Sequence, residues 1–167
     1  MIKLIKDRTL RFILTWTGNI DLDLNAIFPL SNNNICHVFY GNTECLGVKY
    51  SKDSKTGSLE NNGIEIIDIN ILGSYQYTIY VTLYGVFSNQ PLYQSKANLS
   101  LYTANFQEPV FSIDINNSIG LSTNKQSWVG VCFDGATGFS TLRKINEFVD
   151  FEPKYNFCDK YLQLSPN

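Results

Sequence analysis

Apolar and polar residues alternate with a period of two along most of this chain. Between residues 20 and 26, apolar side chains occupy the even positions, whereas Asp21, Asp23 and Asn25 occupy the odd ones. Successive side chains of a β-strand point to opposite faces, so such a segment would bury one face and show the other to water. Stretches with the period of a helix are missing from the sequence, and the pattern therefore predicts an all-β protein.

The alternation marks about nine or ten short strands separated by turn-rich connections. The expected strands cover residues 9–16, 20–26, 35–40, 46–50, 63–69, 75–87, 97–103, 109–116, 127–134 and 141–148. Short strands at this spacing are typical of a β-sandwich. Residues 149–167 lose the alternation and contain Pro153 and Pro166, so we expect an irregular strap across the sandwich. We predict one domain over residues 1–167, with a core at about residues 10–148.

Composition and charge narrow the class of partner. The 167 residues are 44% hydrophobic and 17% charged, which is the composition of a folded protein rather than a disordered one. The 13 basic and 15 acidic residues are spread without blocks and leave a net charge of -2. Nucleic-acid binding depends on a basic patch, so we expect no nucleic-acid partner.

The sequence predicts neither an export signal nor a membrane span. Residues 1–8 have a basic start, but no apolar core of the required length and no small-residue cleavage site follow. The strongly apolar stretch at residues 78–87 is interrupted by polar residues. It falls far short of the roughly 20 apolar residues that cross a bilayer.

Six segments, taken in order along the chain, resemble the motifs of a known family. They are Leu14-Thr15-Trp16, Asp21-Leu22-Asp23-Leu24, His37-Val38-Phe39-Tyr40-Gly41-Asn42, Gly63-Ile64-Glu65-Ile66, Gly73-Ser74-Tyr75-Gln76-Tyr77 and Trp128-Val129-Gly130-Val131-Cys132-Phe133-Asp134-Gly135. The chain is similar to the immunoglobulin-like β-sandwich domain of bacterial and protist surface proteins that includes YfaP-type proteins. The resemblance implies an immunoglobulin-like antiparallel sandwich of about nine strands, and a structural or adhesive role outside the cell or at its surface.

Two departures from the family pattern bear on metal binding. Ile64 stands where relatives have the proline of a Gly-Pro-Glu corner, and residues 48–53 replace a stretch that is often acidic in relatives. A metal site that depended on those acids loses its support.

Asp21 and Asp23 are the candidate metal ligands in this chain. On a strand their side chains share one face and could offer oxygens to Ca²⁺, which needs six to eight of them. Further acids that could join are Asp53, Glu60 and Glu65, which the sequence does not place. The alternative is an exposed polar face. We expect no cofactor, and a bound calcium ion at Asp21 and Asp23 is the alternative.

The four cysteines allow two interpretations. Cys36 and Cys45 could face each other across a hairpin that turns at residues 41–43. Four thiols in a reducing compartment are favoured over two disulfides on these residues alone. A zinc site would have to be assembled from scattered cysteines and His37, and it is disfavoured.

No catalytic constellation is visible in the sequence. His37 is the sole histidine, and its neighbour Cys36 points to the opposite face of the strand, so the two do not form a Cys/His pair. A distant cysteine could still approach it. Asp21 and Asp23 would need an enclosed cleft to act as an acid and base pair. We therefore expect the protein not to be an enzyme.

Tyr80 and Tyr84 are the candidate interaction residues. They fall on the face of their strand opposite to the apolar one, where exposed tyrosines suit protein contacts or stacking on sugars. Coverage of this face by residues 151–164 is the alternative. Trp16 and Trp128 are expected to fill the core.

These observations lead to one functional expectation and one alternative. We expect a non-catalytic structural or protein-interaction module in a surface structure or larger assembly, contacting a protein or its own copies through sheet faces or edges. The alternative is a carbohydrate-binding module that uses exposed aromatic residues, with a structural calcium. The resemblance points outside the cell while the missing signal points inside, so the sequence leaves the location open.

Overall fold

The protein is an all-β sandwich, as the sequence predicts. The computed structural model describes residues 9–18, 20–30, 33–52, 63–70, 75–84, 91–103, 107–120, 125–135 and 141–162. Within them lie the strands β1 (Leu10–Trp16), β2 (Leu22–Pro29), β3 (Ile35–Val38), β4 (Glu44–Cys45), β5 (Val48–Lys52), β6 (Gly63–Ile69), β7 (Gln76–Leu83), β8 (Asn98–Tyr102), β9 (Phe111–Asp114), β10 (Ser127–Asp134) and β11 (Arg143–Val149), and the short helix α1 (Asp159–Leu162). Single 3-10 turns cover Leu92–Gln94 and Ile115–Asn117. No helix in these ranges has the length and apolar character to cross a bilayer.

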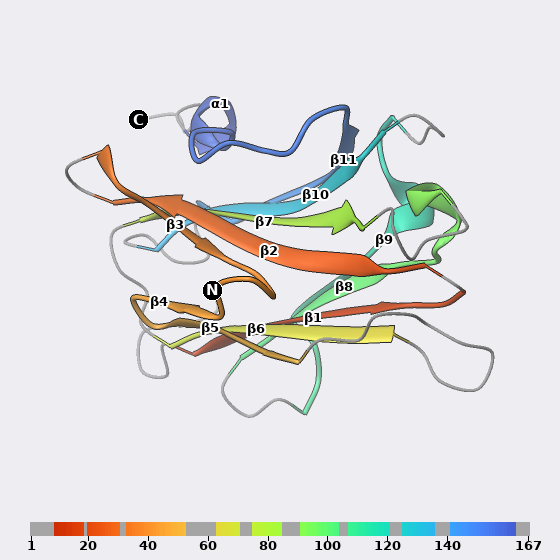
Figure 1. The fold of residues 1–167 in the computed structure, drawn as a ribbon, viewed down its shortest axis with the longest axis horizontal. Helices are drawn as coiled ribbons and strands as arrows, with labels where there is room; N and C mark the ends of the chain where they lie inside the picture. Colours follow the sequence, from red (N-terminus) through yellow and green to blue (C-terminus); the bar gives the residue numbers. More distant parts are fainter. Residues whose placement is uncertain are drawn as a thin grey trace.

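Two antiparallel sheets face each other (Figure 1). The six-stranded sheet has the order β4-β5-β6-β1-β8-β9, and the five-stranded sheet has the order β11-β10-β7-β2-β3. The strand order matches that of immunoglobulin-like sandwiches. In the six-stranded sheet, β5, β6 and β1 take the places of strands D, E and B. In the five-stranded sheet, β10, β7, β2 and β3 take the places of strands G, F, C and C′. The position of strand A, beside β1, is taken by β8, which comes later in the chain. The strand that the sequence pattern missed is the two-residue β4.

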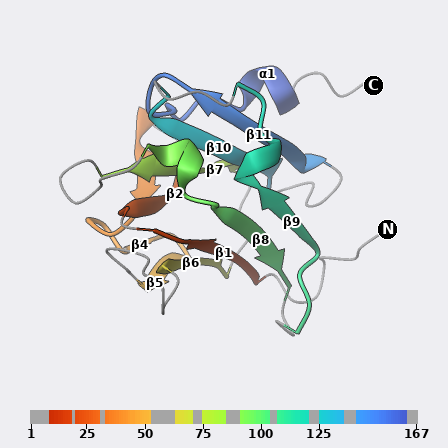
Figure 2. The same ribbon diagram turned by 90° about the vertical axis from the view of Figure 1, so that its right-hand side faces the viewer.

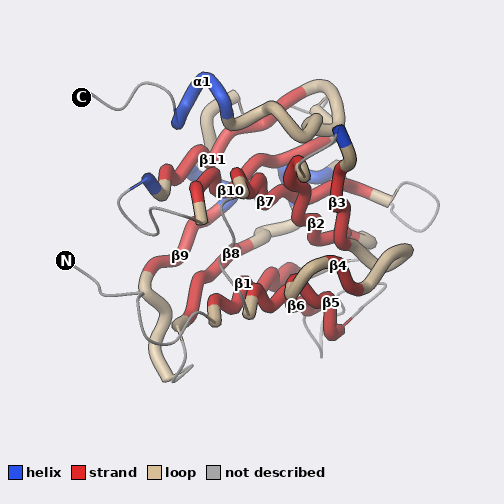
Figure 3. The backbone as a smooth tube through the Cα atoms, turned by 90° about the vertical axis from the view of Figure 1, so that its left-hand side faces the viewer, coloured by secondary structure: helices blue, strands red, loops and turns tan. Residues whose placement is uncertain are grey.

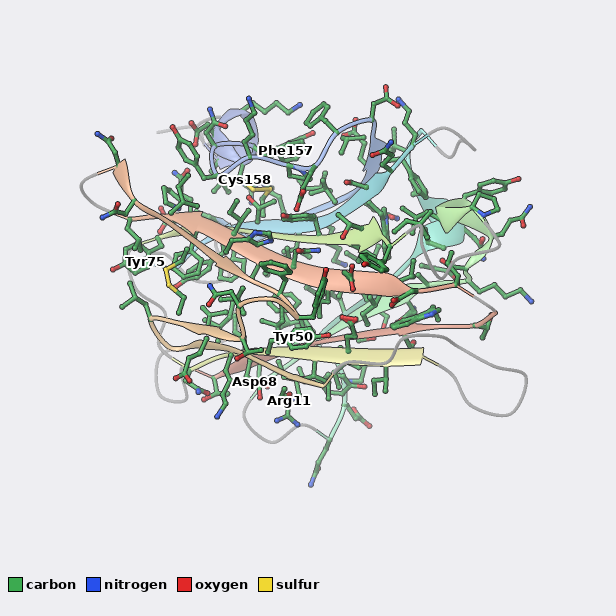
Figure 4. All side chains as sticks on the ribbon, in the orientation of Figure 1. Arg11, Tyr50, Asp68, Tyr75, Phe157 and Cys158 are labelled. Atoms are coloured by element: carbon green, nitrogen blue, oxygen red, sulfur yellow. A yellow bond between two sulfur atoms is a disulfide. The ribbon has the colours of Figure 1, made fainter. Side chains whose placement is uncertain are left out.

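The core follows the alternation of the sequence. Every second residue of β1 is buried between the sheets, and the inward row of β2 consists of Leu22, Leu24, Ala26 and Phe28. Trp16 and Trp128 are 1% and 0% exposed, which confirms that both fill the core. On the outer face of the six-stranded sheet, Arg11 and Asp68 form a two-fold hydrogen-bonded pair at 2.8 and 2.9 Å (Figure 4).

The outer face of the five-stranded sheet departs from the expectation of an exposed polar surface. In β2 and β10, the first seven residues are all buried, so these strands are covered on both faces. Part of the cover on the second face is the C-terminal segment after β11, which lies over β10 and β7, contacts β2 at Ile27 and leads to α1 (Figure 1). The predicted irregular strap is therefore present, and it encloses side chains that the sequence pattern assigns to water.

The strap, residues 150–162, is fixed to the sheet at several points. Cys158 forms a disulfide with Cys132 of β10, and its Sγ lies 2.9 Å from the hydroxyl of Thr78 (Figure 4). A second apolar cluster, separate from the core, joins the strap to the sheet through Ile27, Tyr80, Val129, Cys132, Ile145, Val149, Cys158 and Leu162. Residues 163–167 lie outside the described part of the chain.

The second disulfide joins Cys36 of β3 to Cys45 of β4, with 6.0 Å between their Cα atoms. Both disulfides together leave none of the four cysteines as a thiol. The preference for four thiols in a reducing compartment is therefore wrong for this structure. The spacing of the cysteines along the sequence could not predict the disulfide between Cys132 and Cys158, because this disulfide depends on where the strap crosses the sheet.

The edges of the two sheets are tied to each other. On one side, the Cys36–Cys45 disulfide links the edge strands β3 and β4, which Figure 3 shows close together. On the other side, the chain after β9 bridges to β11: the Ile119 amide donates to the Asn146 carbonyl at 2.8 Å, and the Phe148 amide donates to the Ile119 carbonyl at 2.9 Å (Figure 2). The Ile119 bridge pairs backbone groups of the edge strand β11, whereas the disulfide joins β3 to β4 through side chains and pairs no backbone group.

A glutamate stands in the middle of the core. Glu65 of β6 points inward and is 0% exposed. Its Oε1 accepts a hydrogen bond from the hydroxyl of Tyr50 at 2.5 Å and from the amide of Leu24 in the opposite sheet at 3.2 Å. β3 pairs with β2 only from Ala26 onward, so no residue of β3 is paired with Leu24. The carboxyl group of Glu65 accepts the hydrogen bond from the Leu24 amide in place of a strand carbonyl. Tyr50 lies between the two sheets in Figure 4.

Gly63 allows the close packing of Trp16 against β6. The two residues are cross-strand partners, and a Cβ at position 63 would lie only 2.2 Å from Cε2 of the indole ring. The ring is also held by its Nε1, which donates to the carbonyl of Ile20 at 2.8 Å. Gly63→Ala is therefore expected to lower the free energy of unfolding by about 1–3 kcal/mol, the usual cost of overpacking. Urea denaturation tests this, and an unchanged stability would mean that the indole has room to move.

Candidate functional site

Polar side chains form a row across the outer face of the five-stranded sheet. Asp23 of β2 pairs with Thr82 of β7, and Thr82 pairs with Ser127 of β10 on its other side. The next row toward α1 contains Asn25, Tyr80 and Val129. The strap covers the far end of this face and leaves the Asp23 row at its border.

A recess of about 320 Å³ opens at this border, and we call it the Asp23 recess. It is lined by Asp23, Asn25, His37, Phe39, Tyr40, Thr82, Leu83, Tyr84, Gln126, Ser127 and Glu152. Its floor is the sheet, and Glu152 of the strap forms part of its wall. The volume is that of a small-ligand pocket.

A hydrogen-bond network fixes the polar groups on the floor of the recess. The side-chain amide of Asn25 donates to the Asp23 carbonyl at 3.0 Å and to Thr82 Oγ1 at 3.2 Å. Its Oδ1 therefore faces His37 Nε2, 2.8 Å away, and Nε2 is the donor. The hydroxyl of Tyr80 donates to Glu152 Oε1 at 2.8 Å and lies 3.1 Å from the same Nε2. The strap is thus connected to the floor of the recess.

Burial controls the ionisation of this network. Burial lowers the pKa of His37 below its usual value of 6.5, although the nearby Glu152 carboxylate works in the opposite direction. The pKa of Tyr80 is raised by burial and by its hydrogen bond to Glu152. At neutral pH His37 is therefore an uncharged hydrogen-bond donor.

The lowered pKa of His37 predicts an acid-sensitive fold. The folded protein binds a proton at His37 less readily than the unfolded chain does. As far as His37 contributes, the free energy of unfolding is therefore highest above pH 6.5, and it falls as the pH drops from 6.5 toward the pKa of the folded state. His37 is the sole histidine, so its imidazole NMR signals can be followed alone. We expect a titration midpoint below 6.5, and this part of the pH dependence should disappear in His37→Gln. A midpoint above 6.5 would mean that the ion pair with Glu152 prevails.

Aromatic rings form one corner of the recess. The Phe39 ring stacks on His37 with 4.3 Å between the ring centroids. Tyr40 stands at 83° to Phe39 and at 76° to Tyr84, with centroid distances of 5.2 and 6.1 Å. Both pairs are edge-to-face contacts, so the three rings do not form one flat platform.

Ser127 has an unused hydrogen-bonding group at the recess. The residue is 1% exposed, and its Oγ has no hydrogen-bond partner within the described ranges. A buried hydroxyl without a partner is costly and uncommon in folded proteins. Because Ser127 lines the recess, a bound group or a water molecule can satisfy it.

The predicted site residues have different outcomes. Asp21 and Asp23 are 5% and 6% exposed, so the alternative of an exposed polar face is wrong. Tyr80 is 0% exposed beneath the strap, which corrects its proposed exposure, while Tyr84 is partly exposed and lines the recess. His37 also lines the recess, a role that the sequence did not suggest. Thr82, Gln126, Ser127 and Glu152 were missed, although Thr82 and Ser127 lie on strands whose ranges were predicted.

The calcium hypothesis stays a prediction. Among the residues that the structure describes, no group of three or more acidic, histidine or cysteine side chains gathers as a metal site. Glu65 lies in the core, where its carboxyl group accepts hydrogen bonds from Tyr50 and Leu24, and Asp53 and Glu60 lie outside the described residues.

Comparison with protein-family models, with curated proteins and with solved structures gives no match. The resemblance to YfaP-type domains therefore rests on the six sequence segments, and function has to be argued from the Asp23 recess.

Proposed function

We propose that this protein is a non-catalytic binding module that contacts another molecule through the Asp23 recess, within a surface structure or larger assembly. The observation that carries the proposal is the recess itself, which combines buried hydrogen-bonding groups with a corner of aromatic rings. Recognition sites in proteins commonly pair an apolar wall with a few fixed polar groups.

The closed sheet edges favour this face over strand addition. β3 is joined to β4 by a disulfide, and β11 is bridged by the segment after β9. The expectation of contacts through sheet edges therefore has less support than contacts through the recess on the sheet face.

The network on the recess floor suits binding better than catalysis. His37 Nε2 donates a hydrogen bond to Asn25, and the imidazole ring stacks on Phe39. Both interactions of His37 therefore hold the floor of the recess rigid. A rigid, preorganised floor lowers the entropy lost when a partner binds.

A carbohydrate is the second candidate partner. The lining contains the aromatic ring of Tyr84 and the side-chain amides of Asn25 and Gln126. Sugar-binding sites commonly stack an aromatic ring on the sugar and hydrogen-bond its hydroxyls.

A thermal-shift panel tests the proposed function. The melting temperature would be measured with capped amino acids of each charge type and with common mono- and disaccharides. We expect at least one compound to raise the melting temperature of the native protein and to have a much smaller effect on Tyr84→Leu. If every compound leaves the native protein unchanged, or acts equally on the variant, the recess is not a binding site for these classes.

A further inference from the structure

We infer that the Asp23 recess takes the cationic side chain of a protein partner, a lysine or an arginine. The inference rests on the proposed function and names its ligand class.

The charges of the lining favour a cation. Asp23 and Glu152 are acidic, and in the described part of the chain neither lysine nor arginine lines the recess. His37, the remaining basic side chain of the lining, is kept neutral by the burial that lowers its pKa. Among the described residues of the lining, an entering ammonium or guanidinium group therefore meets acceptors and no positive charge.

The arrangement of the rings favours a cation over a sugar ring. A sugar stacks on an open, flat aromatic face, whereas Tyr40 stands at 83° to Phe39 and at 76° to Tyr84. The face of an aromatic ring attracts a cation, and Phe39, Tyr40 and Tyr84 all line the recess. The carboxyl group of Asp23 lines the same space and adds a full charge to the partial charges of the rings.

Two further groups fit the hydrogen bonds of such a side chain. Ser127 Oγ is buried and has no partner within the described residues, so it can accept from an N–H donor. Glu152 has an exposed side chain at the entrance, with 57% of its surface accessible, and would meet the cation as it enters. Both acidic side chains of the lining, Asp23 and Glu152, would therefore attract the cation.

Calorimetric titration with matched probes separates charge from shape. Choline and 3,3-dimethylbutanol have nearly the same shape, but only choline carries a positive charge. We expect choline to bind the native protein at least about fivefold more tightly, in line with the energy of a cation over aromatic faces. Capped lysine and capped arginine should compete with choline, and high salt should weaken choline binding.

Variants locate the site. Tyr84→Leu keeps an apolar side chain but removes the ring, and Asp23→Asn keeps the shape but removes the charge. Each should weaken choline binding about fivefold or more. Tyr155→Leu and Glu108→Gln, which alter an exposed tyrosine and an exposed acid outside the recess, should leave it unchanged. Circular dichroism and the melting temperature show whether each variant is folded.

The outcomes distinguish this inference from the proposed function. Equal binding of choline and its neutral analogue, or binding that neither variant weakens, would overturn the inference. Saccharide binding that depends on Tyr84 would overturn it too, while leaving the binding role of the recess in place. If neither cations nor saccharides bind, both proposals fail.

Discussion

Removal of the strap disulfide, in the double variant Cys132→Ser/Cys158→Ser, is expected to lower the free energy of unfolding by about 3.5 kcal/mol. This is the loop-closure value for a sequence separation of 26 residues. Cys158 also belongs to the cluster that packs Leu162 of the strap against Ile27 and Val129 of the outer sheet face, so the strap should open more often. Guanidinium denaturation gives the stability, and hydrogen exchange of the strap amides reports its opening.

The other disulfide provides a matched control. Cys36→Ser/Cys45→Ser removes a link across a separation of nine residues, for which the same relation gives about 1 kcal/mol less. It should leave exchange in the strap unchanged. A smaller loss of stability for the strap disulfide than for this control, with no faster exchange, would mean that the strap is held by its other contacts.

Replacement of Glu65 by alanine should lower the free energy of unfolding by about 3 kcal/mol. The change leaves the Tyr50 hydroxyl and the Leu24 amide without their acceptor in the core, and it creates a cavity between the sheets. Glu65→Gln keeps an oxygen at the same place and should cost about 1 kcal/mol. Urea denaturation of both variants measures the difference.

A double-mutant cycle checks the reason for this effect. If the hydrogen bond to Tyr50 matters, the effects of Tyr50→Phe and Glu65→Ala should not add, and the coupling energy should be about 1 kcal/mol. Equal losses in Glu65→Ala and Glu65→Gln would contradict the role given to the acceptor oxygen.

The sequence predicted which residues share a face but not what covers that face. The alternation of residues 20–26 placed the apolar side chains in the core correctly. It assigned Asp21 and Asp23 to water, but both are buried. Part of this face is covered by the strap, which lies far along the chain and crosses the sheet at Cys132. Periodicity describes one strand at a time and contains no information on a distant segment.

The recess could not be assembled from the sequence for a related reason. Asp23, Thr82 and Ser127 become neighbours only through the registers of β2, β7 and β10. Register depends on the pairing of strands, which local patterns do not specify. Glu65 shows the same limit, since its inward position in β6 follows the alternation, but its partner Leu24 lies in the opposite sheet.

We propose the Asp23 recess, rather than a sheet edge or the strap surface, as the binding site. A titration of the ¹⁵N-labelled native protein with capped lysine, followed by NMR, shows which residues the ligand contacts. We expect the largest shifts at Asp23, Thr82, Tyr84 and Ser127, with saturation at one common affinity. Shifts centred on Phe151, Phe157 and Lys160 of the strap surface, or a spectrum that does not change, would contradict the claim.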